Sequence, residues 1–219
     1  MSKRKTTRNR SKRSEGGFSV VEMLAVVAIV VIIGAIALPQ MVSSRRMLRS
    51  VALSRTIMSQ LRWARQQAMA TEQAFTFSYN TNTRVIRIID HGDGAMGAGV
   101  IANVNYPNNG TVVRTIPLDG DGLAAADIMY GPPPSAPVAA RTLGDLSTYT
   151  PPNAGTNLVN ITFQPNGSVI DSTGQPANFA LFIYNARVAD DTARAVSVLG
   201  LGGRVKIWRY DTSVLRYVE

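Results

Sequence analysis

The chain has 219 residues, of which 45% are apolar, 17% are charged and none is cysteine. This length fits one domain or a domain with an appendage, and the apolar content excludes a wholly disordered chain. The lack of cysteine excludes a disulfide scaffold and any cysteine-based metal or redox centre. A single histidine argues against a zinc enzyme or a histidine-dependent hydrolase.

The net charge of +9 is concentrated in the N-terminal quarter of the chain. Residues 1–17 carry +6, residues 18–70 carry +5 and residues 71–219 carry −2. The larger, C-terminal part is therefore mildly acidic, and the overall charge by itself is weak support for a nucleic-acid-binding domain.

The first 38 residues combine a basic leader with a long apolar run. Residues 1–13, MSKRKTTRNRSKR, offer almost nothing to bury, so we expect 1–17 to be a solvated leader. Residues 18–38 include only two polar side chains, Ser19 and Glu22. As a helix this run would span roughly 30 Å, the thickness of the hydrocarbon core of a bilayer. The positive-inside rule predicts a single-pass membrane protein, with its N-terminus cytoplasmic and the C-terminal part exported.

A secretory signal peptide and a plain anchor are the alternatives. The apolar run is too long for a signal peptide and lacks a small-x-small cleavage site after it. A plain anchor leaves two features unexplained. Glu22 places a costly carboxylate inside the run, and Gly16-Gly17 gives a protease an unwound, accessible peptide bond.

The segment EGGFSVVEMLAVVAIVVIIGAIALPQ resembles the class III signal of type IV prepilins and type II secretion pseudopilins. In that family a membrane peptidase cuts after the glycine and methylates the new N-terminus. The resemblance therefore implies processing at Gly16, Gly17 and Phe18, with the cut after Gly17. Glu22 then becomes the fifth residue and Pro39 the twenty-second, where the family has its acid and its helix-kinking proline. Both are implied to serve assembly.

Residues 39–70 are good helix formers without a further proline or glycine. Ile57, Leu61, Ala64 and Ala68 recur with helical spacing and predict a face that packs on a globular head. We therefore expect one helix over 18–70, kinked near Pro39, with its transmembrane or filament-core half over 18–38 and an amphipathic half over 39–70. Its second half carries six arginines, which form either a basic collar for lipid, acidic neighbours or nucleic acid, or a solvated face: Arg45, Arg46, Arg49, Arg55, Arg62 and Arg65.

After Thr71 the pattern alternates, with Gly, Pro and Asn between short runs. Strands are predicted over 74–79, 84–90, 111–116, 158–163, 168–170, 179–188, 194–199 and 204–210. We expect an α+β fold, in which antiparallel sheets of a head at 71–219 pack on the long helix. Residues 119–157 are rich in Gly, Pro and Ala and predict a mobile insertion, with a short helix at 122–129.

The C-terminal part resembles the head of GspH/FimT-type minor pseudopilins. The resemblance rests on a Phe-x-Pro-x-Gly turn at Phe163, Pro165 and Gly167, and on a closing hairpin with a Gly-Arg turn at Gly203 and Arg204. This family supplies the expected function: a minor pseudopilin of a type II secretion system. The implied partners are other pseudopilins or pilins, the prepilin peptidase, an inner-membrane assembly platform and membrane lipid.

Some FimT-type minor pilins bind DNA through a basic Gly-Arg-x-Arg hairpin, and the alternative function is such DNA uptake. The corresponding contact residues are Arg204, Lys206, Trp208 and Arg209, with Lys206 where that pattern has arginine. Alternation along a strand places Arg204, Lys206 and Trp208 on one face and Arg209 on the other. The acidic head and the structural use of such residues in closing strands weigh against this alternative.

The sequence also holds fragments of other sites. Asp119 and Asp121 in LDGDG suggest calcium, but the positions that an EF-hand loop needs are occupied by Leu123 and Tyr130. Asp-Gly turns account for the same residues. No nucleophile has a histidine partner other than His91. We therefore predict neither an enzyme nor a cofactor.

Overall fold

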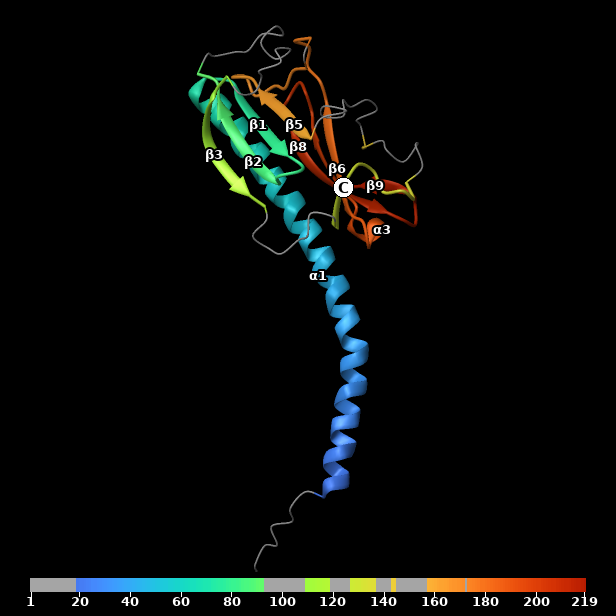
Figure 1. Cartoon of the computed structure of the whole chain (residues 1–219). Helices are drawn as coiled ribbons and strands as arrows, with labels where there is room; N and C mark the ends of the chain where they lie inside the picture. Colours follow the sequence, from blue (N-terminus) through green and yellow to red (C-terminus); the bar gives the residue numbers. More distant parts are fainter. Residues whose placement is uncertain (1–18, 93–108, 119–126, 137–142, 145–156, 172) are drawn as a thin grey trace, which may run out of the picture. The chain divides into compact units, whose positions relative to one another are not determined.

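The structure is a computed structural model that describes residues 19–92, 109–118, 127–136, 143–144, 157–171 and 173–219 (Figure 1). The predicted leader and most of the predicted 119–157 insertion lie outside the described residues. The chain divides into two compact units, residues 1–42 and 43–219, and strands β1 to β9 belong to the second unit.

The long helix α1 extends from Val20 to Thr71. Its segment Val20–Leu38 has a mean hydropathy of 2.9 and buries none of its side chains, so it is long and apolar enough to cross a membrane. The helix assignment continues through Pro39. The predicted helix is therefore confirmed over its described part, while the kink at Pro39 stays a prediction.

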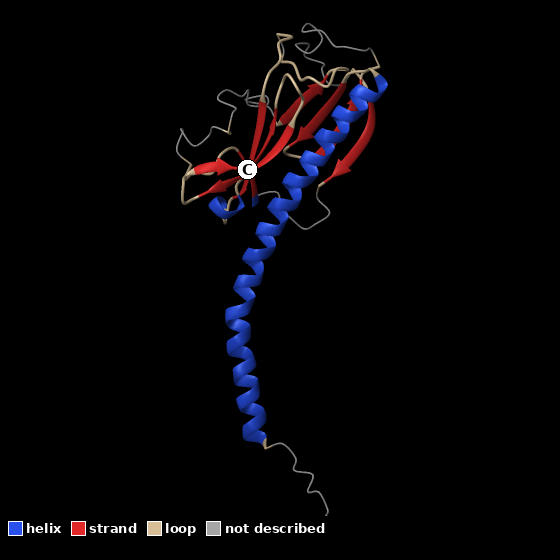
Figure 2. Cartoon of the chain, turned by 180° about the vertical axis from the view of Figure 1, so that it is seen from behind, coloured by secondary structure: helices blue, strands red, loops and turns tan. Residues whose placement is uncertain are grey.

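In the second unit, α1 buries the face that the sequence predicted. Ile57, Ala64 and Ala68 have no exposed surface, and Leu61 is 1% exposed. These residues recur every three or four positions and therefore lie on one side of the helix. Figure 2 shows this part of α1 lying across the strands.

The first sheet has four antiparallel strands in the order β3-β2-β1-β5. Their bounds are β1 Phe75–Asn80, β2 Val85–Asp90, β3 Thr111–Pro117 and β5 Leu158–Phe163. Phe77 of β1 lies opposite Ile88 of β2 and Ile161 of β5, and all three side chains are buried. The strands predicted over 74–79, 84–90, 111–116 and 158–163 are confirmed to within one residue at each end.

The second sheet has five antiparallel strands in the order β4-β6-β7-β8-β9. Its strands are β4 Ile128–Tyr130, β6 Phe179–Asn185, β7 Arg194–Val198, β8 Val205–Asp211 and β9 Arg216–Val218. A single helical turn, α3 at Ala189–Thr192, connects β6 to β7. Because β6 to β9 follow one another in sequence and in space, short turns connect most of this sheet.

Two clusters of buried side chains stabilise the second unit. The larger one joins the buried face of α1 to the facing sides of both sheets, with Phe77, Phe163 and Val196 among its members. The smaller one covers the other side of the second sheet and includes Phe182 and Trp208. This is the expected α+β, pilin-like arrangement of a helix packed on antiparallel sheets, and the predicted fold class is confirmed.

The structure differs from the sequence prediction in short segments. Residues 128 and 129, predicted as the end of a helix, belong to β4, because Ile128 is buried and pairs with Asn185; residues 122–126 lie outside the described residues. Val169 and Ile170 make isolated bridges instead of a strand. The strand predicted over 179–188 ends at Asn185, where the chain turns into α3. Strand β9 was not predicted.

Candidate functional site

The residues predicted for processing and assembly belong to the first unit. Gly16, Gly17 and Phe18 lie outside the described residues. Glu22 lies in the first turn of α1 and is exposed, as are the apolar side chains that follow it. A carboxylate on an otherwise apolar helix surface has a counter-ion in lipid only if another molecule supplies one.

Two glycine turns that the sequence singled out meet beside α1. Gly203 adopts a left-handed backbone with φ of 57°, and Gly167 does the same with φ of 78°. A Cβ at residue 203 would overlap the carbonyl oxygen of Gly167 and lie 2.7 Å from Nε of Arg65. Nε of Arg65 donates a hydrogen bond to the same carbonyl, at 3.4 Å. The β7–β8 turn is thereby held against the turn after β5 and against the helix.

A basic groove of about 390 Å³ lies beside these turns. We define the basic groove by its charged members, which come from α1, from β8 and the residue before it, and from residue 219: Arg62, Arg65, Arg204, Lys206 and Glu219. The remaining lining residues are Gln66, Gly202, Gly203, Val205 and Ile207. Strand β9 pairs with β8 at residues 209–211. In the described part of the chain it does not cover the start of β8, so that start borders the groove.

The cations of the basic groove have different partners. Lys206 Nζ lies 2.6 Å from Oε2 of Glu219. This hydrogen bond, together with the charges of Lys206 and Arg204, holds the pKa of the Glu219 carboxyl below its usual value. Arg62 donates to the main-chain carbonyl of Val205 at 3.3 Å. Within the described part of the chain, no carboxylate lies within 4.0 Å of the guanidinium of Arg62, Arg65 or Arg204.

The four residues predicted to contact nucleic acid do not form one surface in the structure. Arg204 and Lys206 line the basic groove. Trp208 is only 6% exposed; its Nε1 donates to Oγ of Ser197 at 2.7 Å, and Lys206 Nζ lies 5.1 Å from its ring centroid. Arg209 is exposed, and its guanidinium lies 4.0 Å from Asp211. Alternation along β8 points Arg209 to the opposite side of the sheet from Lys206 and Trp208.

The sequence analysis did not predict that helix α1 contributes to this groove. It assigned Arg62 and Arg65 either to a basic collar or to a solvated face and did not connect them with the hairpin cations. Their distance from Arg204 in sequence is large, and only the packing of β8 against α1 brings them together. The helical spacing of Arg62 and Arg65 was the available signal, but it does not identify the surface that the helix faces.

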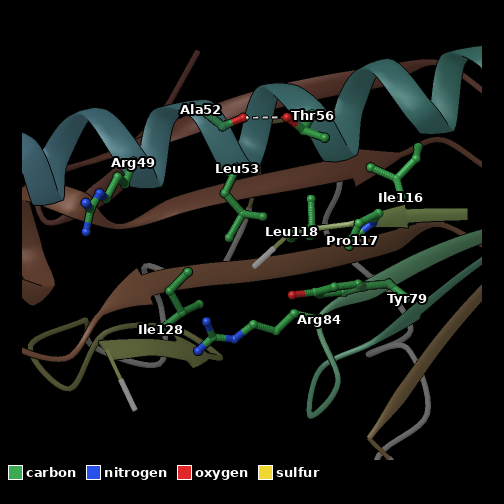
Figure 3. A pocket seen from close by; sticks show the side chains of 10 residues that line it. All are labelled: Arg49, Ala52, Leu53, Thr56, Tyr79, Arg84, Ile116, Pro117, Leu118 and Ile128. Atoms are coloured by element: carbon green, nitrogen blue, oxygen red, sulfur yellow. Dashed lines mark hydrogen bonds between the residues drawn. The ribbon is translucent and has the colours of Figure 1, made fainter. Parts of the chain in front are cut away.

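A second pocket, of about 260 Å³, lies between α1 and the first sheet (Figure 3). Arg49 and Leu53 of α1 line one side, and Tyr79 and Arg84 lie across from them. The remaining lining residues are Ala52, Thr56, Ile116, Pro117, Leu118 and Ile128. Apolar walls with two guanidinium groups suit an apolar acid. Leu118 is the last described residue before 119–126, and we assign no ligand to this pocket.

Tyrosine hydroxyl groups meet at the edge of this second pocket. The hydroxyl of Tyr79 is hydrogen-bonded to that of Tyr130, and the two rings pack edge to face at 5.6 Å. Burial raises the pKa of Tyr130, although the bond to Tyr79 and the charge of Arg84 act against this rise. The pair fastens the short strand β4 to the first sheet.

The structure does not describe the metal ligands that the sequence suggested. Asp119 and Asp121 lie outside the described residues, so calcium binding remains untested. In the described ranges there is no group of three or more His, Cys, Asp or Glu residues placed to hold a metal ion. His91 is 7% exposed and its Nε2 lies 2.7 Å from the hydroxyl of Thr76, which in turn bonds to Thr162. His91 thus belongs to a polar network on the first sheet.

Comparison with known proteins gives one structural likeness. No protein-family model matches the sequence, and no curated protein matches it. The chain is similar to a solved structure of the type IV minor pilin FimU of Pseudomonas aeruginosa, with 16% sequence identity. The match covers 81% of this chain and 96% of that chain, with a TM-score of 0.42.

Proposed function

We propose that this chain is a minor pseudopilin of a type II secretion system, with a structural and not an enzymatic role. A prepilin peptidase would cleave it after Gly17, and the mature chain would join a short periplasmic pseudopilus that supports protein export. Before assembly it would lie in the cell inner membrane, with its leader cytoplasmic and its head periplasmic. Its partners would be membrane lipid, the peptidase, other pseudopilins and the inner-membrane assembly platform.

One observation carries this proposal: the sequence register of Gly17, Phe18, Glu22 and Pro39 with the apolar run. The described part of that helix, Val20–Leu38, exposes its apolar side chains along its whole length. Such a surface is stable only in lipid or against other apolar helices. A helix that serves in both environments at different times is what a filament subunit stored in a membrane requires.

Glu22 would then direct assembly. Cleavage creates a free α-amine on Phe18, in the same membrane layer as the carboxylate of Glu22. When the amine of one subunit pairs with the carboxylate of its neighbour, two isolated charges are removed from lipid together. The pairing favours insertion beside another subunit over an isolated position in the membrane.

Intact mass and N-terminal sequencing of the membrane-bound protein from its own host test the proposal. We expect a chain that begins at methylated Phe18. A Gly17→Val variant should keep residues 1–17, whereas Glu22→Ala should be cleaved normally but be lost from filaments. A wild-type chain that still begins at Met1 would refute the filament role.

A second candidate function is that of a FimT-like minor type IV pilin that binds DNA for uptake. The observation that favours it is the basic groove, where Arg62 and Arg65 add two cations to Arg204 and Lys206. Salt-dependent gel shifts of the full chain in detergent would test it, with loss of binding expected for Arg204→Ala and Lys206→Ala. The absence of a shift at low salt would exclude this candidate.

A further inference from the structure

The basic groove already holds one carboxylate of this chain. Glu219 is anchored at a single atom, through the 2.6 Å contact of its Oε2 with Lys206, and its side chain remains 61% exposed. An ion pair with one partner exposed in this way contributes little to stability. The groove therefore accepts a carboxylate at hydrogen-bond distance, and an incoming acid can displace Glu219 at small cost.

The other three cations retain donors for an anion. Arg62 and Arg65 use single hydrogen bonds to main-chain carbonyls, at 3.3 and 3.4 Å, although a guanidinium has five N–H donors. With Arg204 and Lys206 they give the groove four cations, which face the side-chain carboxylate of Glu219. Like charges one turn apart on a helix repel one another and destabilise it. A bound anion would remove this cost.

The lining of the groove favours an acidic protein over a nucleic acid. Single-stranded nucleic acids are held by cations together with aromatic rings on which bases stack. No aromatic residue lines the groove among the described residues, and the neighbouring Trp208 is buried, with its Nε1 bonded to Ser197. The cations are also gathered in one pocket of about 390 Å³ at the junction of α1 and β8.

We propose that the basic groove binds acidic side chains of a neighbouring filament subunit, and that Glu219 occupies the site until that neighbour arrives. This inference rests on the proposed pseudopilin function and identifies a contact between heads. Because Arg62 and Arg65 lie on α1, the contact would involve the long helix as well as the sheets. It would therefore fix the rotation of each head relative to the next. Replacement of one carboxylate by another keeps the exchange reversible.

The direct test measures binding of a fluorescein-labelled hexaglutamate peptide to the full chain in detergent micelles. Arg62→Gln and Arg204→Gln should each weaken binding about three- to tenfold, and added salt should weaken it further. Glu219→Gln should tighten binding about two- to fivefold, because it removes the internal competitor. Arg55→Gln is the matched control: Arg55 lies exposed on the same helix, outside the groove, and its loss should leave binding unchanged.

Three results would overturn the inference. One is equal binding by the wild type and the Arg62→Gln and Arg204→Gln variants, each shown to be folded by circular dichroism. Another is equal weakening by Arg55→Gln, which would indicate attraction to overall charge. The third is a groove that binds a labelled DNA duplex but not hexaglutamate, which would assign it to nucleic acid instead.

Filament sedimentation from the host separates this inference from the function on which it rests. We expect Arg62→Gln and Arg204→Gln chains to be cleaved normally and to be depleted from filaments, unlike Arg55→Gln. Normal cleavage with undiminished filament content would refute the groove contact alone. An uncleaved wild-type chain would refute the pseudopilin function itself.

Discussion

The backbone of Gly203 lies directly against the carbonyl oxygen of Gly167, although the two residues belong to different turns. Both have left-handed backbone conformations, which residues with a Cβ adopt only at a cost. The contact sets the β7–β8 turn beside Arg65 and so forms one wall of the basic groove.

Gly203→Ala should therefore destabilise the head by about 2–4 kcal/mol, from the strained backbone and from the overlap with Gly167. Chemical denaturation of the full chain in detergent, followed by tryptophan fluorescence, gives the free energy of unfolding. Gly202→Ala is the neighbouring control, because no atom lies within 4 Å of a Cβ there. If both variants unfold at the same denaturant concentration, the turn contact has no role in stability.

Leu61→Ala should cost about 2–5 kcal/mol of unfolding free energy, since Leu61 is 1% exposed in the core between α1 and the sheets. Leu48→Ala is the same substitution on the same helix at a side chain that is 69% exposed, and it should change the free energy by less than about 0.5 kcal/mol. The two midpoints, measured by denaturation under identical detergent conditions, should differ clearly. Similar losses would mean that the buried face of α1 is wrongly assigned.

Ser197→Ala should destabilise the head by about 1–3 kcal/mol, because it leaves the buried Nε1 of Trp208 without its acceptor. Ser59→Ala serves as control, since the Ser59 hydroxyl is exposed and bonds only within its own helix, donating to the carbonyl of Thr56 and accepting from Nε2 of Gln60. The free energies of unfolding of both variants should be compared with that of the wild type. A Trp208→Phe background should abolish most of the Ser197→Ala effect, and a persistent loss would argue against this hydrogen bond.

Raising the pH above about 10 should destabilise the head through Tyr130. Burial raises the pKa of Tyr130 above its ordinary value of 10.0. In that range the unfolded chain has lost the tyrosine proton while the folded chain retains it, so stability falls as pH rises. In a titration followed by tyrosinate absorbance, the Tyr130→Phe variant should lack one tyrosine that ionises at high pH in the wild type. The free energy of unfolding of this variant should also depend less on pH. An unchanged titration curve would contradict the assignment.

The sequence was informative where a local pattern determines the outcome. Ile57, Leu61, Ala64 and Ala68 predicted the buried helix face because helical periodicity is a property of neighbouring residues. Strands of five to seven residues were likewise predicted, because they are long enough to show alternation. The three-residue strands β4 and β9 are too short to show it, and β4 forms because Ile128 finds a place beside β6.

The composition of the basic groove could be predicted only in part. Arg204 and Lys206 stand out in a basic hairpin motif, but their meeting with Arg62 depends on how β8 packs against α1. Trp208, which the alternation of the strand had grouped with the two cations, is buried in the smaller cluster on the other side of the second sheet. Alternation identifies which side chains share a face, whereas the rest of the fold determines whether that face is accessible.

The attachment of α1 to the head has a mechanical consequence for a subunit that is pushed or pulled along its helix. Ser50 donates to the carbonyl of Thr192 at 2.6 Å, and Arg65 bonds to Gly167 fifteen residues further along. Leu53, Ile57, Leu61 and Ala64 of the buried helix face lie between these two points. A force along the helix axis therefore loads all these contacts in shear at once, instead of peeling them apart one by one. Separation of the helix from the sheets would require the head to unfold, and the unfolding rate would limit how long the subunit bears the load.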